Sequence, residues 1–440
     1  MERKISEILI KWQKKEKKRM PLILSGARQV GKTYILREFA RKNYKNSIYV
    51  NLETNLSVAS FFENDISPER IIRFLEASFN ESIIPGETLI ILDEIQFCER
   101  ALTSLKYFCE NANEYHVVAA GSLLGVAINR TKYSFPVGKV EIFTLYPMNF
   151  EEFLWAVQKH KLAAMISESY NHNICLPEAL HLQALELYKI YLIVGGMPAA
   201  VMIYVETGQL IEIPDIQNNI LNSYIADMAK YTTNSESVKI RAAYNSLPNQ
   251  LAKNNKKFQY KIVQKGGNAK IFGTAIEWLI FSGVVLKCQK NEKALMPLAA
   301  YTDLSSFKLY MADTGLLTMK SGLAYQTILS NLETDNIFLG SLAENYVAQE
   351  LASKNYPLIY WESKGIAEID FLLQSGEKII PVEVKSGINT RSKSLSIFVK
   401  KYKPDYSIRI SAKNFGFENN IKSIPLYSVY NLNVGPAAIV

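Results

Sequence analysis

The sequence contains 440 residues, of which 48% are hydrophobic and 21% are charged, which is ordinary for a globular protein. This length is enough for two to four domains of roughly 100–200 residues each. The formal net charge of +8 is a mild excess that permits a nucleic-acid partner without requiring one.

The cysteines, the histidines and the apolar runs argue against a disulfide-rich, zinc-binding, secreted or membrane-spanning protein. No pair among the four cysteines has C-x-x-C spacing, and the four histidines do not cluster with them, so a disulfide framework and a structural zinc site are disfavoured. Residues 1–10 carry charges throughout and lack the apolar core of a signal peptide. The longest apolar run, residues 275–286, is too short to span a bilayer and contains Glu277. We therefore expect a cytoplasmic protein with no membrane partner.

The first third of the chain alternates short apolar runs with helical patterns, which is typical of a parallel α/β sheet. Strands are expected at residues 21–25, 47–52, 88–92, 116–120 and 142–146, and helices at residues 32–42, 66–79 and 101–111. The pattern changes near Pro147. Residues 150–240 are expected to be mostly helical, with a break at Gly195-Gly196, and the last hundred residues to form one long helix and then strands.

A glycine-containing loop lies between the first expected strand and the first expected helix. It matches the pattern G-x-x-x-x-G-K-[ST] with Gly26, Ala27, Arg28, Gln29, Val30, Gly31, Lys32 and Thr33. Such glycines let backbone N–H groups close around phosphate oxygens, and the positive end of the following helix faces the same anion. We expect Lys32 to neutralise the β- and γ-phosphates of ATP and the Thr33 hydroxyl to ligate Mg²⁺.

Polar side chains end two of the other expected strands. Asp93 and Glu94 follow residues 88–92, at the sheet edge where doubly wound folds bind their ligands. Asp93 suits a Mg²⁺ partner, directly or through water, and Glu94 suits a general base that polarises the attacking water. Two solvated acids at the start of a loop are the alternative. Ser122, after the fourth strand, would orient water or read the γ-phosphate, unless it is only a polar turn residue.

These motifs resemble those of AAA-type (ASCE) P-loop ATPases, and more closely those of a prokaryotic AAA-like family whose C-terminal half is a domain of unknown function. The resembling segments are SGARQVGKT at 25–33, LDEIQ at 92–96, AGS at 120–122, FPVGK at 135–139 and LYPMNFEEF at 145–153, and matching segments extend over nearly the whole chain. The resemblance implies an α/β fold with a three-layer, parallel-sheet ATPase core at 1–155, a helical lid at 156–235, a winged-helix-like basic section at 236–325 and an α+β, restriction-endonuclease-like domain at 326–440.

Many members of that family have an arginine where this chain has Lys139. A lysine supplies positive charge but not the bidentate fork of a guanidinium group. If this position supplies a finger or sensor residue, Lys139 would act less strongly there than an arginine. Arg130 is a second candidate for that role. A purely structural role is the alternative for both residues.

The segment at residues 366–385 contains two alternating runs around Gly376-Glu377, a Gly-X turn that suits a two-residue hairpin. One face of this hairpin is expected to be apolar, with the pairs Phe371–Val382, Leu373–Ile380 and Ile369–Val384. The other face is expected to pair Asp370 with Glu383 and Glu368 with Lys385, at the separation of about 4.5–5.5 Å between Cβ atoms that directly opposed residues have.

Two opposed carboxylates repel each other, so a divalent cation or a bound proton should compensate. Asp370 followed by Glu383-x-Lys385 resembles the D…E-x-K constellation of PD-(D/E)XK nucleases. That resemblance implies that the acids hold Mg²⁺ and that the lysine positions or activates water for phosphodiester cleavage. Glu344, on a helix expected at 341–354, is a further candidate ligand. Two alternatives stay open: a solvated hairpin face, and a nuclease fold without activity.

The middle of the chain carries a lysine-rich segment at residues 249–270. Six lysines are interleaved with Phe258 and Tyr260: Lys253, Lys256, Lys257, Lys261, Lys265 and Lys270. Helices at 238–254 and 268–286 would frame a helix-turn-helix, and the related family has a winged-helix module here. The lysines would then contact phosphates with salt-dependent, sequence-tolerant affinity. A solvated basic loop is the alternative.

Together these features predict an ATPase that uses ATP and Mg²⁺ and whose nucleotide cycle controls a nuclease-like, DNA-directed domain. A nucleotide-dependent switch or scaffold for a protein partner, with an inactive nuclease fold, is the alternative. A small-molecule P-loop kinase fits less well, because Asp93-Glu94 and the large C-terminal half favour hydrolysis coupled to motion. The sequence leaves oligomerisation open.

Overall fold

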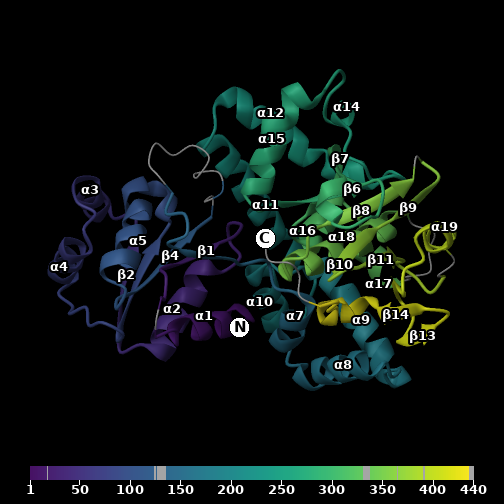
Figure 1. Cartoon of the computed structure of the whole chain (residues 1–440), viewed down its shortest axis with the longest axis horizontal. Coiled ribbons are helices and arrows are strands. Elements are labelled where there is room, and N and C mark those ends of the chain that lie inside the picture. Colours follow the sequence, from purple (N-terminus) through teal and green to yellow (C-terminus); the bar gives the residue numbers. More distant parts are fainter. Residues whose placement is uncertain are drawn as a thin grey trace. The chain divides into compact units, whose positions relative to one another are not determined.

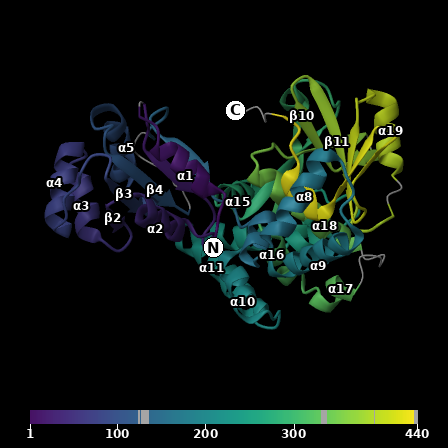
Figure 2. The same cartoon turned by 90° about the horizontal axis from the view of Figure 1, so that it is seen from below.

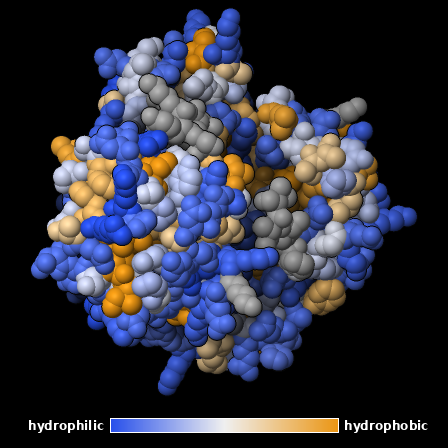
Figure 3. Space-filling view, turned by 60° about the vertical axis from the view of Figure 1, so that its left-hand side comes forward, coloured by the Kyte–Doolittle hydropathy of each residue, from blue (hydrophilic) through white to orange (hydrophobic). Residues whose placement is uncertain are grey.

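The computed structural model describes residues 1–16, 18–122, 125, 135–330, 337–363, 365–389 and 392–435 (Figure 1). Two compact units are present. The first is made of Glu2–Tyr146 with Phe281–Gly283, and the second mainly of Pro147–Ile280 and Val284–Val440. Within the described ranges, no helix combines the length and the apolar character needed to cross a bilayer. On the face drawn in Figure 3, hydrophobic residues lie in small groups among hydrophilic ones.

A parallel sheet of five strands forms the centre of the first unit, as predicted, with the strand order β2-β3-β4-β1-β5. The strands are β1 Leu22–Ser25, β2 Asn46–Asn51, β3 Thr88–Asp93, β4 His116–Gly121 and β5 Glu141–Thr144. β3 and β4 are buried along their whole length. Both faces of the sheet are therefore covered, which explains why these strands read as continuous apolar runs rather than alternating ones.

Helices cover both faces of this sheet (Figure 2). They are α1 Ile5–Gln13, α2 Lys32–Asn43, α3 Leu56–Asn64, α4 Pro68–Phe79 and α5 Glu99–Asn111, with the 3-10 helix η1 Ile95–Phe97. α2 and α5 connect strands in opposite directions across the sheet, so right-handed crossovers place them on opposite faces. The sequence predicted one helix at 66–79. A separate α3 precedes it, because the Asn55 side chain caps α3 and Pro68 starts α4 anew.

The second unit begins with a helical region, also as predicted. It contains α7 Phe150–Ala156, α8 His160–His172, α9 Glu178–Val194, α10 Pro198–Thr207, α11 Ile213–Lys230 and α12 Asn234–Asn245. The break after α9 has a packing cause. Oδ2 of the buried Asp313 accepts a hydrogen bond of 2.6 Å from the Gly196 amide, and a Cβ on Gly195 would lie 2.3 Å from Asp313 Oδ1. Only glycine lets the chain approach this carboxylate so closely.

Two mixed sheets form the rest of the second unit. One has the order β7-β6-β8-β9 and the other the order β10-β11-β12-β14-β13. The strands are β6 Val285–Asn291, β7 Thr302–Met311, β8 Ile359–Ser363, β9 Ala367–Ile369, β10 Phe371–Ser375, β11 Lys378–Val384, β12 Ser407–Ser411, β13 Gly416–Glu418 and β14 Ile421–Pro425. The helices are α13 Leu247–Leu251, α14 Tyr260–Val263, α15 Ala269–Phe281, α16 Thr314–Ser321, α17 Tyr325–Ser330, α18 Ile337–Ser353 and α19 Lys393–Tyr402, with η2 Leu298–Tyr301 and η3 Leu426–Asn431.

The two helices expected around the lysine-rich segment were predicted too long. The first is divided into α12 and α13, because Pro248 lies in the first turn of α13 and cannot continue the preceding helix. The second, α15, ends at Phe281, before Gly283 with its φ of 73°, and the chain then forms β6. The strands β6 and β7 were not predicted. The expected long helix near residues 341–354 is confirmed as α18.

Candidate functional site

The phosphate-loop motif lies between β1 and α2 in the first unit. Gly26 and Gly31 have positive φ angles of 144° and 97°, which residues with a side chain rarely adopt. A Cβ on Gly26 would also lie 2.2 Å from the Leu145 carbonyl oxygen. The motif therefore needs Gly26 and Gly31 for the conformation of its backbone. Gly31 is also the N-cap of α2, and a helix N-terminus attracts anions.

Lys32 is the first residue of α2, and its side chain folds back over the loop. Its Nζ donates hydrogen bonds of 2.9 Å to the Gly26 carbonyl and 2.8 Å to the Ala27 carbonyl. The residue is only 7% exposed. The ammonium charge is therefore held at the loop, where the motif requires it.

Thr33 and Asp93 meet, although they are far apart in the sequence. The Thr33 hydroxyl donates a 2.7 Å hydrogen bond to Asp93 Oδ2, and the Glu94 amide donates a 2.9 Å bond to Asp93 Oδ1. Asp93 is 2% exposed. Hydroxyl and carboxylate oxygens are the ligands that Mg²⁺ prefers, so these two side chains fit the metal that the loop motif implies.

Tyr49 is a residue of this site that the sequence analysis missed. Its hydroxyl donates a 2.8 Å hydrogen bond to Asp93 Oδ2. Burial, and then the bond to Asp93, raise the pKa of Tyr49 to about 12. The only sequence signal was its position near the end of β2, beside β3.

Glu94 and Ser122 lie at the same sheet edge as the loop. Glu94 has a left-handed backbone, with φ 52°, and its carboxylate accepts a 2.5 Å hydrogen bond from Gln96. Such a backbone is uncommon outside glycine and is concentrated at functional sites. Ser122 is buried and follows Gly121, which pairs with Ser25 at the start of the loop.

Lys139 is not brought to the phosphate loop of its own chain. Its Nζ forms a 2.9 Å ion pair with Glu110 at the end of α5, which raises the pKa of Lys139. It precedes β5, whose Glu141 pairs with Leu22 at the start of β1. Lys139 therefore lies at the amino edge of the sheet, opposite the loop. Arg130 lies outside the described residues.

The hairpin in the second unit was predicted correctly only near its turn. Phe371 pairs with Val382 and Leu373 with Ile380, as expected. Beyond Phe371 the prediction is wrong, because the chain crosses from one sheet to the other at Asp370. β9 pairs with β8, so Glu368 lies opposite Glu362 rather than Lys385, and Ile369 lies opposite Trp361 rather than Val384.

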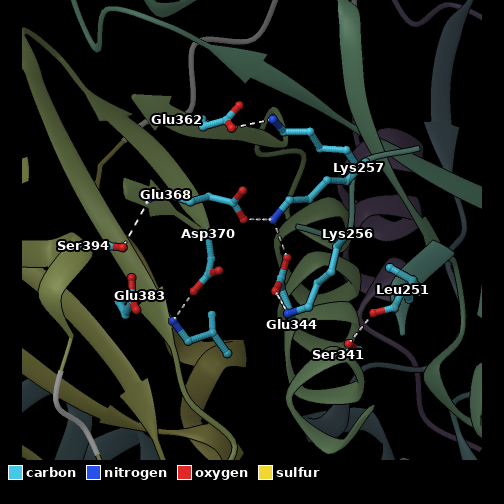
Figure 4. A network of polar contacts seen from close by, with 12 residues as sticks. Leu251, Lys256, Lys257, Ser341, Glu344, Glu362, Glu368, Asp370, Glu383 and Ser394 are labelled. Atoms are coloured by element: carbon cyan, nitrogen blue, oxygen red, sulfur yellow. Dashed lines mark hydrogen bonds and ion pairs between the residues drawn. The ribbon is translucent and has the colours of Figure 1, made fainter. Parts of the chain in front are cut away.

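Asp370 is left outside both ladders, and it is not paired with Glu383 as a strand neighbour. Its Oδ2 instead accepts a 2.7 Å hydrogen bond from the Val384 amide. Figure 4 shows its carboxylate between Glu368 and Glu383. Burial, then the nearby charges of Glu344 and Glu383, raise the pKa of Asp370 well above its ordinary value.

Glu344, expected as a metal ligand, is held by lysines. Lys256 forms an ion pair with its Oε2 (Figure 4). Lys308 forms an ion pair of 2.9 Å with its Oε1 and one of 2.6 Å with Glu368, and the Tyr310 hydroxyl donates to the same Oε1. Lys308 is fully buried, so its charge is committed to these two carboxylates. Neither lysine was predicted here.

Glu383 and Lys385 lie together, as their spacing on one strand face predicted. Lys385 Nζ and Glu383 Oε1 form a 2.7 Å ion pair, and the Ser392 hydroxyl donates 2.9 Å to the same oxygen. Glu344, Glu368 and Glu383 are thus matched by Lys256, Lys308 and Lys385. Among the residues that the structure describes, no three acidic, histidine or cysteine side chains are grouped so that they could hold a metal ion.

The lysine-rich segment is used in two ways. Lys256 and Lys257 turn toward carboxylates, the second forming an ion pair with Glu362 (Figure 4), which corrects their expected role as phosphate contacts. Phe258 is half-buried and stacks on the buried Phe307, with ring centroids 5.5 Å apart. The other four lysines of the segment remain exposed.

Three parts of the chain match protein-family models. Residues 18–154 match a family described as an AAA domain. The amino-terminal unit is an AAA-type P-loop ATPase domain. Residues 185–327 and 339–429 match two families that are each described as a domain of unknown function (DUF8612 and DUF4143). No curated protein matches the chain.

Solved structures resemble the chain at low sequence identity. A Walker-type ATPase of Pyrococcus abyssi is 14% identical over 72% of this chain and 95% of that one, with a TM-score of 0.44. The ORC1 protein of Aeropyrum pernix in complex with DNA is 12% identical over 74% and 92%, with a TM-score of 0.28. AMPPCP-bound DnaA from Aquifex aeolicus is 11% identical over 64% and 89%, with a TM-score of 0.27. Likeness at this level carries no information on activity.

Proposed function

We propose that this protein binds ATP together with Mg²⁺ and hydrolyses it. The observation that carries the proposal is the contact of 2.7 Å between Thr33 and Asp93 at the end of a phosphate loop. Thr33 comes from the helix that follows the loop, and Asp93 comes from the end of a buried strand. Their meeting gives the oxygen pair that holds Mg²⁺ in P-loop ATPases.

Each residue of the site has a role in this proposal. The loop amides and Lys32 bind the phosphates, and Thr33 and Asp93 hold the metal. Mg²⁺ held by these two side chains would supply positive charge to neutralise the phosphates. Glu94 polarises the attacking water, and Ser122 contacts the γ-phosphate or that water.

Lys32→Ala is the first test of the ATPase proposal. Lys32→Ala removes the charge at the loop, so ATP turnover is expected to fall at least 100-fold, the order of magnitude lost with one electrostatic contact to developing charge. Circular dichroism checks that the fold is kept. Lys42→Ala, at the exposed far end of the same helix, is the matched control and should retain turnover. Unchanged turnover in Lys32→Ala would remove the active-site assignment.

Glu94→Gln separates binding from hydrolysis. Because the amide cannot accept the proton of water, this variant should bind ATP as the wild type does but hydrolyse it at least 100-fold more slowly, the effect expected for a general base. Fluorescent-nucleotide titration and phosphate release measure the two steps. Turnover at the wild-type rate would exclude Glu94 as the base.

The nucleotide cycle is proposed to control the second unit, which acts as a scaffold for a partner rather than as a nuclease. The charge balance around Glu344 favours the scaffold, because Lys256 and Lys308 already occupy its oxygens. Glu344 is therefore committed to lysines rather than to the metal that a nuclease would need. The nuclease hypothesis rests on Asp370, Glu383 and Lys385 lying close together, and its DNA partner on the four exposed lysines of the basic segment.

Cleavage assays distinguish these two functions. Wild-type protein with Mg²⁺ or Mn²⁺ is expected to leave DNA and RNA intact, with and without ATP, and Asp370→Ala and Glu383→Ala should behave alike. Cleavage by the wild type that both variants abolish would restore the nuclease function. Cleavage that the variants retain would point to a contaminating nuclease.

A further inference from the structure

Tyr49 lies beside the metal-binding pair of the ATPase site without belonging to its sequence motifs. Its hydroxyl donates to Asp93 Oδ2 at 2.8 Å, and the Thr33 hydroxyl donates to that same oxygen at 2.7 Å. The other carboxylate oxygen, Oδ1, accepts the Glu94 amide at 2.9 Å. Both Asp93 oxygens are thus fixed by neutral donors, and Tyr49 supplies one of three hydrogen bonds.

The strand register explains how Tyr49 reaches this carboxylate. In the parallel pair of β2 and β3, Tyr49 lies opposite Ile91 and Asn51 lies opposite Asp93. Side chains alternate along a strand, so Tyr49 and Asp93 point to the same face, one step apart on the diagonal. A diagonal neighbour is within reach of a long aromatic side chain, and a shorter residue at 49 would not reach.

An arginine of helix α2 contacts the tyrosine ring. The Arg37 guanidinium carbon lies 4.0 Å from the centre of the Tyr49 ring, a cation–π contact. Arg37 follows Thr33 by one helical turn, so both side chains leave the same face of α2. One face of this helix therefore contacts Asp93 directly through Thr33 and indirectly through Tyr49.

We propose that Tyr49 is a positioning residue of the ATP site, which orients the Asp93 carboxylate for Mg²⁺. The inference rests on the proposed ATPase function. The Thr33 hydroxyl has two lone pairs beside its proton, so it can ligate the metal while it still donates to Asp93. The Tyr49 bond comes from a ring held by Arg37 and is independent of the metal.

Tyr49→Phe tests this role, because it keeps the ring and its contact with Arg37 but removes the hydroxyl. Calorimetric titration of a non-hydrolysable ATP analogue at graded Mg²⁺ concentrations gives the Mg²⁺ concentration for half-maximal tightening. We expect that concentration to rise about tenfold in the variant, the lower end of the effect of losing a residue that orients a metal ligand. Affinity for the analogue in EDTA should stay at the wild-type value.

Tyr44→Phe is the matched control. It removes another tyrosine hydroxyl of the same unit, which shares a 2.7 Å hydrogen bond with His116 Nδ1, and it should leave the Mg²⁺ dependence unchanged. Wild-type Mg²⁺ dependence in Tyr49→Phe, or an equal shift in Tyr44→Phe, overturns the inference alone. Failure of the wild type to bind the analogue, or equal binding by Lys32→Ala, overturns the proposed function and the inference with it.

Discussion

The two units stabilise buried acidic side chains in different ways. In the first unit, the buried carboxylate of Asp93 is satisfied by two hydroxyl groups and one amide. In the second, the buried carboxylate of Glu344 is satisfied by Lys256, Lys308 and the Tyr310 hydroxyl. Neutral donors leave a negative charge that can attract a cation, whereas ammonium groups cancel it. The identity of the donors, more than the number of acids, decides which cluster suits a metal ion.

Replacing Lys308 should give the largest effect among the tests of this comparison. In Lys308→Met, Glu344 and Glu368 lose a fully buried partner, and breaking a buried ion pair from one side costs about 3–5 kcal/mol of unfolding free energy. Urea unfolding measures the loss. Lys378→Met, which breaks the exposed ion pair with Asp405, is the control and should unfold like the wild type. Equal stability of the two variants would show that the buried lysine does not balance the cluster.

Asp313 sharpens the comparison, since its buried carboxylate is also held by neutral donors, the Gly196 and Leu316 amides. Burial raises the pKa of Asp313 to about 6. Between about pH 4 and 6 the folded state keeps a proton that the unfolded state has released, so the unfolding free energy falls as the pH rises through this window, by at most about 3 kcal/mol.

Asp313→Asn removes this titration. Urea unfolding of the wild type and the variant at several pH values gives the difference between them. The stability of the wild type relative to the variant should decrease from about pH 4 to about pH 6 and then level off. A difference that is independent of pH would mean that Asp313 releases its proton at the same pH in both states.

Asp370→Asn should have the smallest effect. Burial and the neighbouring acids raise the pKa of Asp370, which makes its charged form less favourable than that of an exposed aspartate, and an asparagine oxygen can still accept the bond from the Val384 amide. We expect a change in unfolding free energy of less than about 1 kcal/mol. Urea unfolding at neutral pH measures it. A strong destabilisation would show that Asp370 is needed as an anion, and the cluster would then carry a charge available to a cation.

The sequence predicted those features that depend on neighbouring residues. The phosphate loop, the buried strands and the turn of the hairpin each depend on a few consecutive positions. The crossing at Asp370 was not predictable from the hairpin pattern, because alternation continues through it while the partner strand changes. Lys308 and Tyr49 were missed for the same reason. Their partners, Glu344 and Asp93, lie on other elements, and only the assembled fold brings them together.

The close approach of Gly26 to Leu145 has a mechanical consequence. The Leu145 amide donates a 2.8 Å hydrogen bond to the Ser25 carbonyl, and its own carbonyl fills the space where a side chain on residue 26 would be. The main chain of Leu145 therefore packs directly against the phosphate loop, and backbone atoms cannot rotate away from the loop as a side chain can. A displacement of the loop at Gly26 would therefore act on Leu145, which Tyr146 links by covalent bonds to Pro147, the first residue of the long run of the second unit.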